Sequence, residues 1–204
     1  NTLVFYTSDN GSYMYSYDDS EKQDHVDDST IQGFRAENHR ANGPLRGTKA
    51  DVWEAGHRVP FFVRWPGHIQ AGSQCSEPIT HTDIYATCAQ VIGAKLQSAE
   101  CEDSSSLWSL LQQEAGAKRE AHVVNHSVGG MFAIRDGRWK LGLGDGSGGR
   151  EKPRGKPFAR PYQLFDLSED LGEQHNVIDQ HPEVAERMEK ILETYRSSGR
   201  SVNR

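Results

Sequence analysis

The sequence opens on Asn1-Thr2-Leu3-Val4-Phe5-Tyr6-Thr7-Ser8-Asp9-Asn10-Gly11, and this stretch decides the fold class. Its apolar, β-branched and aromatic run predicts a buried strand, and the polar residues that follow predict a loop at the carboxyl end of that strand. Ligands of open α/β sheets bind at this edge. Asp9 and Asn10 offer two hard oxygen donors there, which suit calcium or magnesium better than zinc. Taken alone, Asp9-Asn10-Gly11 is also typical of an ordinary turn.

The composition limits the possible partners. The 204 residues carry a formal net charge of -6, from 23 Lys and Arg against 29 Asp and Glu, with no long block of one sign. This balance argues against nucleic-acid binding. No stretch approaches the ~20 apolar residues of a membrane span, so no membrane partner is expected. Because a chain rarely begins at a metal loop, we expect this sequence to be the C-terminal part of a longer polypeptide.

The chain divides into two predicted parts. Residues 1–118 have the pattern of an α/β layer, with strands at 3–7 and 61–65, a helix at 84–92 and a long polar excursion at 12–46. Residues 119–204 change period and predict a small antiparallel sheet that packs against one C-terminal helix. The expected strands and helix of this second part are 123–124, 131–135, 139–143, 162–167 and 182–198.

Several motifs, in order, resemble the C-terminal half of the type I, formylglycine-dependent sulfatases of the alkaline-phosphatase-like superfamily. They are Thr7-Ser8-Asp9-Asn10-Gly11, Gly47-Thr48-Lys49, Trp53-Glu54-Ala55-Gly56-His57-Arg58-Val59-Pro60-Phe61, Trp65-Pro66-Gly67, His81-Thr82-Asp83-Ile84-Tyr85-Ala86-Thr87, Ile134-Arg135-Asp136-Gly137-Arg138-Trp139-Lys140 and Leu164-Phe165-Asp166-Leu167. The resemblance covers nearly all of the chain. It implies an α/β fold with a mixed, mainly parallel sheet flanked by helices, followed by the small antiparallel sheet and terminal helix.

The resemblance also implies site residues. Asp9 and Asn10 take the positions of two calcium ligands, and Lys49 takes the position of the lysine that faces the sulfate. An ammonium is a compact point charge that suits sulfate and leaving-group oxygens. Without the other motifs, Lys49 reads as a solvated surface lysine.

One departure from the family pattern limits what this chain does alone. Sulfatases use a formylglycine made from Cys or Ser in Cys/Ser-x-Pro-x-Arg, and a further upstream Asp pair on the calcium. Neither feature is present: Cys75, Cys88 and Cys101 lack the motif and read as buried or free thiols. The resemblance therefore implies that formylglycine and the Asp pair belong to a missing N-terminal half. We expect this chain alone to be inactive and to contact that half along an exposed sheet edge.

Three histidines are candidate substrate-binding residues. His57 precedes Arg58-Val59-Pro60 and could face the substrate or pack beside the sheet. His25 and His39 lie in the 12–46 excursion, which could read sugar hydroxyls at the pocket mouth or be a solvated loop. Arg58 is predicted to be structural, in a pair with an acidic residue such as Glu54.

Three functions remain open from the sequence. The first is hydrolysis of a sulfate ester on a saccharide or aryl group, with a periplasmic or secreted location. The second is a phosphatase or phosphonate hydrolase of the same superfamily, although these two-metal enzymes place a His where Asn10 stands. The third is a binding module without catalysis.

Overall fold

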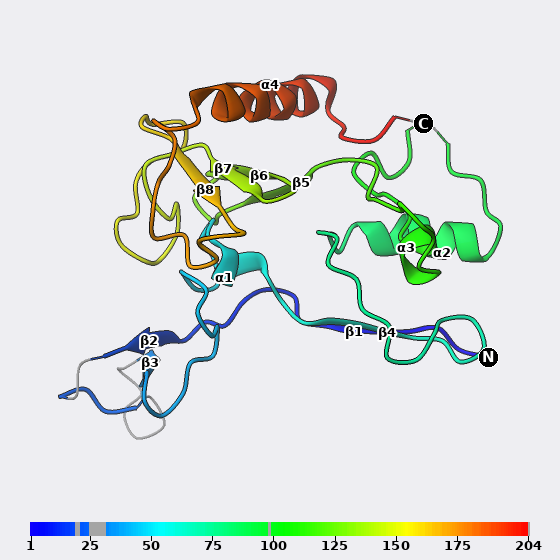
Figure 1. Ribbon diagram of the computed structural model, residues 1–204, viewed down its shortest axis with the longest axis horizontal. Helices are drawn as coiled ribbons and strands as arrows, with labels where there is room; N and C mark the ends of the chain where they lie inside the picture. Colours follow the sequence, from blue (N-terminus) through cyan, green and yellow to red (C-terminus); the bar gives the residue numbers. More distant parts are fainter. Residues whose placement is uncertain (19–20, 25–31, 98, 204) are drawn as a thin grey trace.

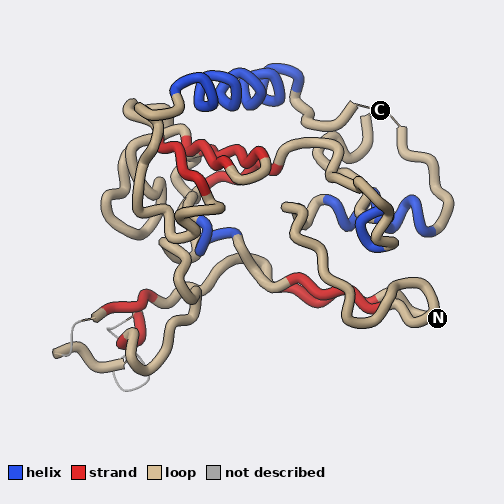
Figure 2. The backbone as a smooth tube through the Cα atoms, in the orientation of Figure 1, coloured by secondary structure: helices blue, strands red, loops and turns tan. Residues whose placement is uncertain are grey.

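The computed structural model describes residues 1–18, 21–24, 32–97 and 99–203. Figure 1 shows a long helix, α4, lying over a small sheet at one side, with helices α2 and α3 at the other and a two-stranded ribbon below them. The same arrangement is visible in the tube of Figure 2, where loops form much of the chain. Among the described residues, no helix has the length and apolar character to cross a membrane.

The opening stretch forms strand β1, Val4–Thr7, which pairs with β4, Phe61–Arg64. The pairing is antiparallel, with Tyr6 opposite Phe62. β1 is therefore not the buried strand that its apolar sequence predicts, since its residues alternate between exposed and half-buried. Within the described part of the chain each of the two strands has only the other as a partner, so the outer edges of the ribbon are unpaired, and one of its faces is also open. Val4, Tyr6 and Phe62 on that face are 45%, 69% and 62% exposed.

The polar excursion contains a second small pair, β2, Tyr15–Tyr17, and β3, Gly33–Arg35, which run parallel. The excursion is fastened to the loop near residue 150. There the Arg150 guanidinium lies 3.6 Å from the Tyr13 ring centroid and donates to Gln32 Oε1 at 2.8 Å. Stacking of Arg on Tyr combines dispersion with cation–π attraction. These contacts connect the excursion to the C-terminal part of the chain.

The described residues of the first part form the helices α1, Glu54–His57; α2, Asp83–Val91; and α3, Trp108–Leu111. The start of α2 is anchored by Asp83, which is fully buried. Its carboxylate accepts from Arg119 Nε at 2.8 Å and Arg119 Nη2 at 2.9 Å, and also from the Thr80 and Ser105 amides at 2.8 Å. This bidentate pair joins α2 to the segment that enters the second part.

The second part is the predicted antiparallel sheet. Its strands lie in the order β5, Val123–His126; β6, Phe132–Asp136; β7, Trp139–Gly142; and β8, Gln163–Asp166. Gly137, at φ +56°, makes the tight turn between β6 and β7. Helix α4, Pro182–Ser198, covers one face of the sheet and ends at Gly199 in the left-handed conformation.

Two apolar clusters enclose this sheet. On the α4 side, Ile134, Leu141 and Leu164 pack with Met188 and Leu192. A second cluster unites strand residues with the segment that leads into α1, and its buried members are Val52, Trp53, Met131, Ala133, Phe165 and Leu167. The segment that carries the predicted site therefore rests on the C-terminal sheet.

Candidate functional site

Helix α1 joins the two predicted site segments. The amide of Gly11 donates to the carbonyl of Gly56 at 3.1 Å, and the amide of Ala55 donates to the carbonyl of Arg46 at 2.9 Å. A third bond joins the segments directly, from the Lys49 amide to the Ser12 carbonyl at 2.9 Å. The Asp9-Asn10 turn and the lysine turn are thus fixed to each other through backbone bonds.

Asp9 and Asn10 lie at the carboxyl end of β1, as the sequence predicts. Asn10 Nδ2 donates to the Gly11 carbonyl at 3.1 Å, which leaves Oδ1 free to accept. Asp9 is exposed, and its carboxylate has no hydrogen bond or ion pair to the described residues. Two free oxygens from adjacent residues fit part of a calcium site. The described residues contain no group of three or more His, Cys, Asp or Glu side chains that could hold a metal ion, so these two ligands alone do not complete one.

The lysine turn is organised by a buried carboxylate. Asp51 is fully buried, and its Oδ2 accepts from the Thr48 amide at 2.8 Å. Its Oδ1 accepts from the amides of Arg150 at 2.5 Å and Glu151 at 3.1 Å. Ala50, between Lys49 and Asp51, has φ +80°, a left-handed conformation that costs energy in a residue with a Cβ.

This turn presents Lys49 to solvent. Lys49 is exposed, and within the described part of the chain its ammonium makes no ion pair or hydrogen bond. The backbone is therefore held firmly while the charge stays available to an anion. Strain next to a residue with such a predicted role is typical of functional sites.

His57 ends α1, immediately after Gly56. His57 is an exposed residue, but partial desolvation of its ring, together with the charge of Lys140, lowers the pKa of His57 below its usual range. A neutral imidazole can donate one hydrogen bond and accept another. The prediction for Arg58 is confirmed, since its Nη1 lies 3.1 Å from Glu54 Oε2.

Sequence reasoning missed a buried ion cluster beneath α1. Lys140 on β7, 2% exposed, lies 3.1 Å from Glu54 Oε1 and 2.9 Å from Glu173 Oε1. Burial opposes ionisation of Glu54, but the charges of Lys140 and Arg135 prevail and lower the pKa of Glu54 to about 2. The partners of Lys140 come from α1 and from the segment after β8.

His39 packs against a residue of its own excursion. His39 is exposed and packs edge-on against Phe34, with ring centroids 5.1 Å apart. His25 lies outside the described residues. The excursion does line a cavity of about 650 Å³ that reaches Thr48, beside Lys49, and Tyr15, Tyr17, Arg40 and Arg46 contribute to its wall.

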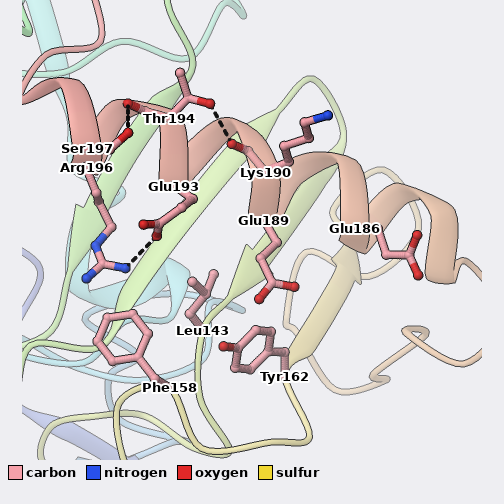
Figure 3. Close-up of a pocket in the computed structure, with 10 residues that line it drawn as sticks. All are labelled: Leu143, Phe158, Tyr162, Glu186, Glu189, Lys190, Glu193, Thr194, Arg196 and Ser197. Carbon is pink, nitrogen blue, oxygen red and sulfur yellow. Dashed lines mark hydrogen bonds and ion pairs between the residues drawn. The ribbon is translucent and has the colours of Figure 1, made fainter.

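A second cavity, of about 550 Å³, lies between α4 and the segment 143–162 (Figure 3). Figure 3 shows Glu189 pointing toward Tyr162 below the helix. Arg160 Nη2 contacts both oxygens of Glu189 at 3.0 Å, so this carboxylate already has a cationic partner. None of the predicted site residues that the structure describes lines this cavity.

Comparisons with known proteins identify the family. Residues 1–94 match the sulfatase family model. The chain is 31% identical to the N-acetylgalactosamine-6-O-sulfatase of Bacteroides thetaiotaomicron, over 97% of this chain and 37% of that protein. It is 29% identical to arylsulfatase A of Bos taurus, over 90% of this chain and 35% of that protein.

Solved structures agree with the sequence matches. A Bacteroides thetaiotaomicron structure, from work on the metabolism of multiple glycosaminoglycans, is 29% identical over 97% of this chain and 39% of its own, with a TM-score of 0.76. A structure in complex with a neocarrahexaose is 27% identical over 96% of this chain and 36% of its own, with a TM-score of 0.66.

The fold is that of the alkaline-phosphatase-like hydrolases. Within that class, the chain belongs to the sulfatase family. It spans 37% and 35% of the lengths of the two relatives named above.

Proposed function

We propose that the complete protein is a sulfuric ester hydrolase. The observation that carries this proposal is the free Lys49 ammonium, held on a rigid turn that is bonded to the Asp9-Asn10 segment, in a chain of the sulfatase family. A fixed cation near hard oxygen ligands is suited to an ester that carries negative charge on several oxygens.

The roles follow from the side chains. Asp9 and Asn10 would hold calcium through their free oxygens, and the ion would supply positive charge opposite the sulfate oxygens. Lys49 would stabilise charge on the sulfuryl and leaving oxygens. His57, which stays neutral near pH 7, would contribute a hydrogen bond without adding repulsion toward Lys49 or the metal.

The remaining catalytic parts are proposed to come from residues outside this chain. The chain has no Cys/Ser-x-Pro-x-Arg segment for a formylglycine, and the second Asp pair for the metal is proposed to precede Asp9 in the complete protein. The open face of the β1–β4 ribbon, with Val4, Tyr6 and Phe62 exposed, is suited to cover by an N-terminal half of the same protein. The 204-residue chain alone is therefore expected to be inactive.

A sulfated saccharide is the proposed substrate class, ahead of an aryl sulfate. One relative is named as an N-acetylgalactosamine-6-O-sulfatase, and one related structure holds a neocarrahexaose. The cavity beside Thr48, with its Tyr and Arg side chains, offers room for sugar rings next to Lys49. His39 and His25 remain proposed contacts from the same excursion. An exported, periplasmic or secreted, enzyme fits a polysaccharide substrate.

The experiment compares sulfate with phosphate. The complete protein is incubated with 6-sulfated N-acetylgalactosamine, an aryl sulfate and an aryl phosphate, and released anions are measured by ion chromatography. We expect sulfate release and little phosphate release, because Asn10 stands where a two-metal phosphatase would place a His. Preferential phosphate release would support the phosphatase alternative, and no release of either anion would support a binding module.

A further inference from the structure

The buried ion cluster connects the C-terminal sheet to the candidate site. The Lys140 ammonium is enclosed between Glu54 and Glu173, and Glu173 Oε2 also accepts from the amide of Glu54 at 2.5 Å. Glu173 is fully buried and Glu54 is 5% exposed. The first residue of α1 is thus held at both its amide and its carboxylate by groups of the second part.

The same short helix holds both site segments. Gly56, two residues after Glu54, accepts from the Gly11 amide, and Ala55 donates to the Arg46 carbonyl. A helix of four residues has little stability of its own, so its position depends on its tertiary contacts. Any movement of Glu54 is therefore passed to the Asp9-Asn10 turn, the lysine turn and His57.

Stability alone is a weak reason for such a cluster. Removing charges from water is costly, and apolar residues of similar volume often serve the fold as well as a buried ion pair does. Ionised groups also fix the relative position and orientation of the elements that carry them, because each charge has few acceptable positions relative to its partners. Lys140 has one partner in α1 and one in the segment after β8, which fixes α1 in both position and orientation.

We propose that Lys140 is a positioning residue of the sulfatase site, which through Glu54 and Glu173 fixes α1 and so the placement of the Asp9-Asn10 turn, the Lys49 turn and His57. The term sulfatase site rests on the proposed function. The effect of Lys140 on the position of α1 can be tested without any substrate.

The test is amide hydrogen exchange on the folded chain. The variant Lys140→Met/Glu173→Gln removes one charge of each sign and leaves Glu54 paired with Arg58 and Arg135. We expect the amides of Gly11 and Ala55 to lose protection by about tenfold relative to the Met188 amide in α4. The control Arg58→Met removes an exposed partner of the Glu54 carboxylate. It should leave the ratio of protection at Gly11 and Ala55 to protection at Met188 unchanged.

A second readout follows the His57 ring by NMR titration. The charged and titratable groups that face it are Lys140 on β7, Glu54 on α1 and His126 on β5, and the Asp51 backbone adds a hydrogen bond. Loss of the Lys140 charge should raise the pKa of His57, whereas Glu173→Gln alone should not.

Two results would overturn the proposal. One is an equal loss of protection at Gly11, Ala55 and Met188, which would mean general destabilisation. The other is unchanged protection at Gly11 and Ala55 in the folded variant. If the double variant does not fold, Glu173→Gln alone must still lower the ratio, by about threefold, or the proposal fails. Absence of sulfate release would refute the proposed function and leave these exchange results standing.

Discussion

Gly11 and Gly56 meet through a 3.1 Å backbone hydrogen bond, and the chain at Gly11 lies so close to α1 that a Cβ there would fall 1.5 Å from the Ala55 carbonyl oxygen. Only a residue without a side chain can occupy this position. Gly11→Ala should therefore displace the Asp9-Asn10 turn and lower the free energy of unfolding by about 3 kcal/mol. Urea unfolding of the wild-type chain and of Gly11→Ala measures this change in free energy.

Gly142→Ala is the matched control for Gly11→Ala. Gly142 is buried in β7, and a Cβ there would meet its nearest atoms only at 3.9 Å, an ordinary contact distance. We expect a change below about 1 kcal/mol, since the added methyl also restricts the unfolded chain. Similar losses for the two variants would contradict the argument from close approach.

Lys49→Ala tests the proposed role of the ammonium in the complete enzyme. Loss of a charged donor aimed at the transition state should lower kcat by about 10²- to 10³-fold. The side chain is exposed and its ammonium makes no hydrogen bond or ion pair within the described chain, so Tm should stay nearly constant. Lys49→Arg should restore little activity, because a planar guanidinium does not replace a compact ammonium.

Lys95→Ala is the control for a lysine away from the site, since Lys95 is also exposed. It should change neither kcat nor Tm. Near-full activity of Lys49→Ala on a sulfated substrate would show that Lys49 does not take part in the reaction.

Asp9→Ala tests the proposed metal site. In the complete protein this change should weaken calcium binding in calorimetry, because a carboxylate is the stronger of the two donors offered here. Asp179→Ala, at an exposed residue far along the chain, should leave the affinity unchanged. The 204-residue chain should bind calcium weakly, and micromolar binding to it that Asp9→Ala abolishes would show that fewer ligands suffice.

Arg119→Leu tests the pair that anchors α2. The change leaves the Asp83 carboxylate buried with only the Thr80 and Ser105 amides as charge-stabilising partners, so the free energy of unfolding should fall by about 3–5 kcal/mol. Arg138→Leu breaks a pair with Asp166 in which the arginine side chain is 53% exposed, and should cost less than about 1 kcal/mol. Equal costs in denaturant titrations would contradict the role of burial.

The pH dependence of stability should carry a contribution from Glu54. Its pKa is about 2 in the folded chain, below the ordinary value of 4.5, so its stabilisation is present above pH 4.5 and is lost as the pH falls toward 2. The contribution is on the order of 3 kcal/mol. Burial raises the pKa of Glu173, which acts in the opposite sense. The difference in unfolding free energy between the wild-type chain and Glu54→Gln should therefore shrink on acidification, and a constant difference would contradict the assignment.

Local signals predicted the second part of the fold well. The hairpin glycine Gly137, the helix start at Pro182 and the stop at Gly199 stand at the boundaries expected from the sequence, because turn and cap chemistry acts over a few residues. The antiparallel pairing of β1 with β4 was not predicted from the sequence. Strand pairing is decided by distant segments, and an apolar run does not encode it.

The same limit applies to the site. Asp9, Asn10 and Lys49 could be predicted because their motifs are short and ordered. The partners of Glu54 could not, since Lys140 and Glu173 follow it by 86 and 119 positions. No local period or motif marks these three residues as one group. The roles of Asp9, Asn10, Lys49, His57, His39 and His25 remain predictions.

The placement of Lys140 and Glu173 has a consequence for dividing the protein into modules. A cut between residues 118 and 119, where the sequence predicts a boundary between two parts, would leave the Glu54 carboxylate on one piece and its buried cation on the other. Each piece would then expose groups that are stable only together. Changes such as domain grafting or directed recombination should therefore keep α1, β7 and the segment after β8 together and take all three from the same parent sequence.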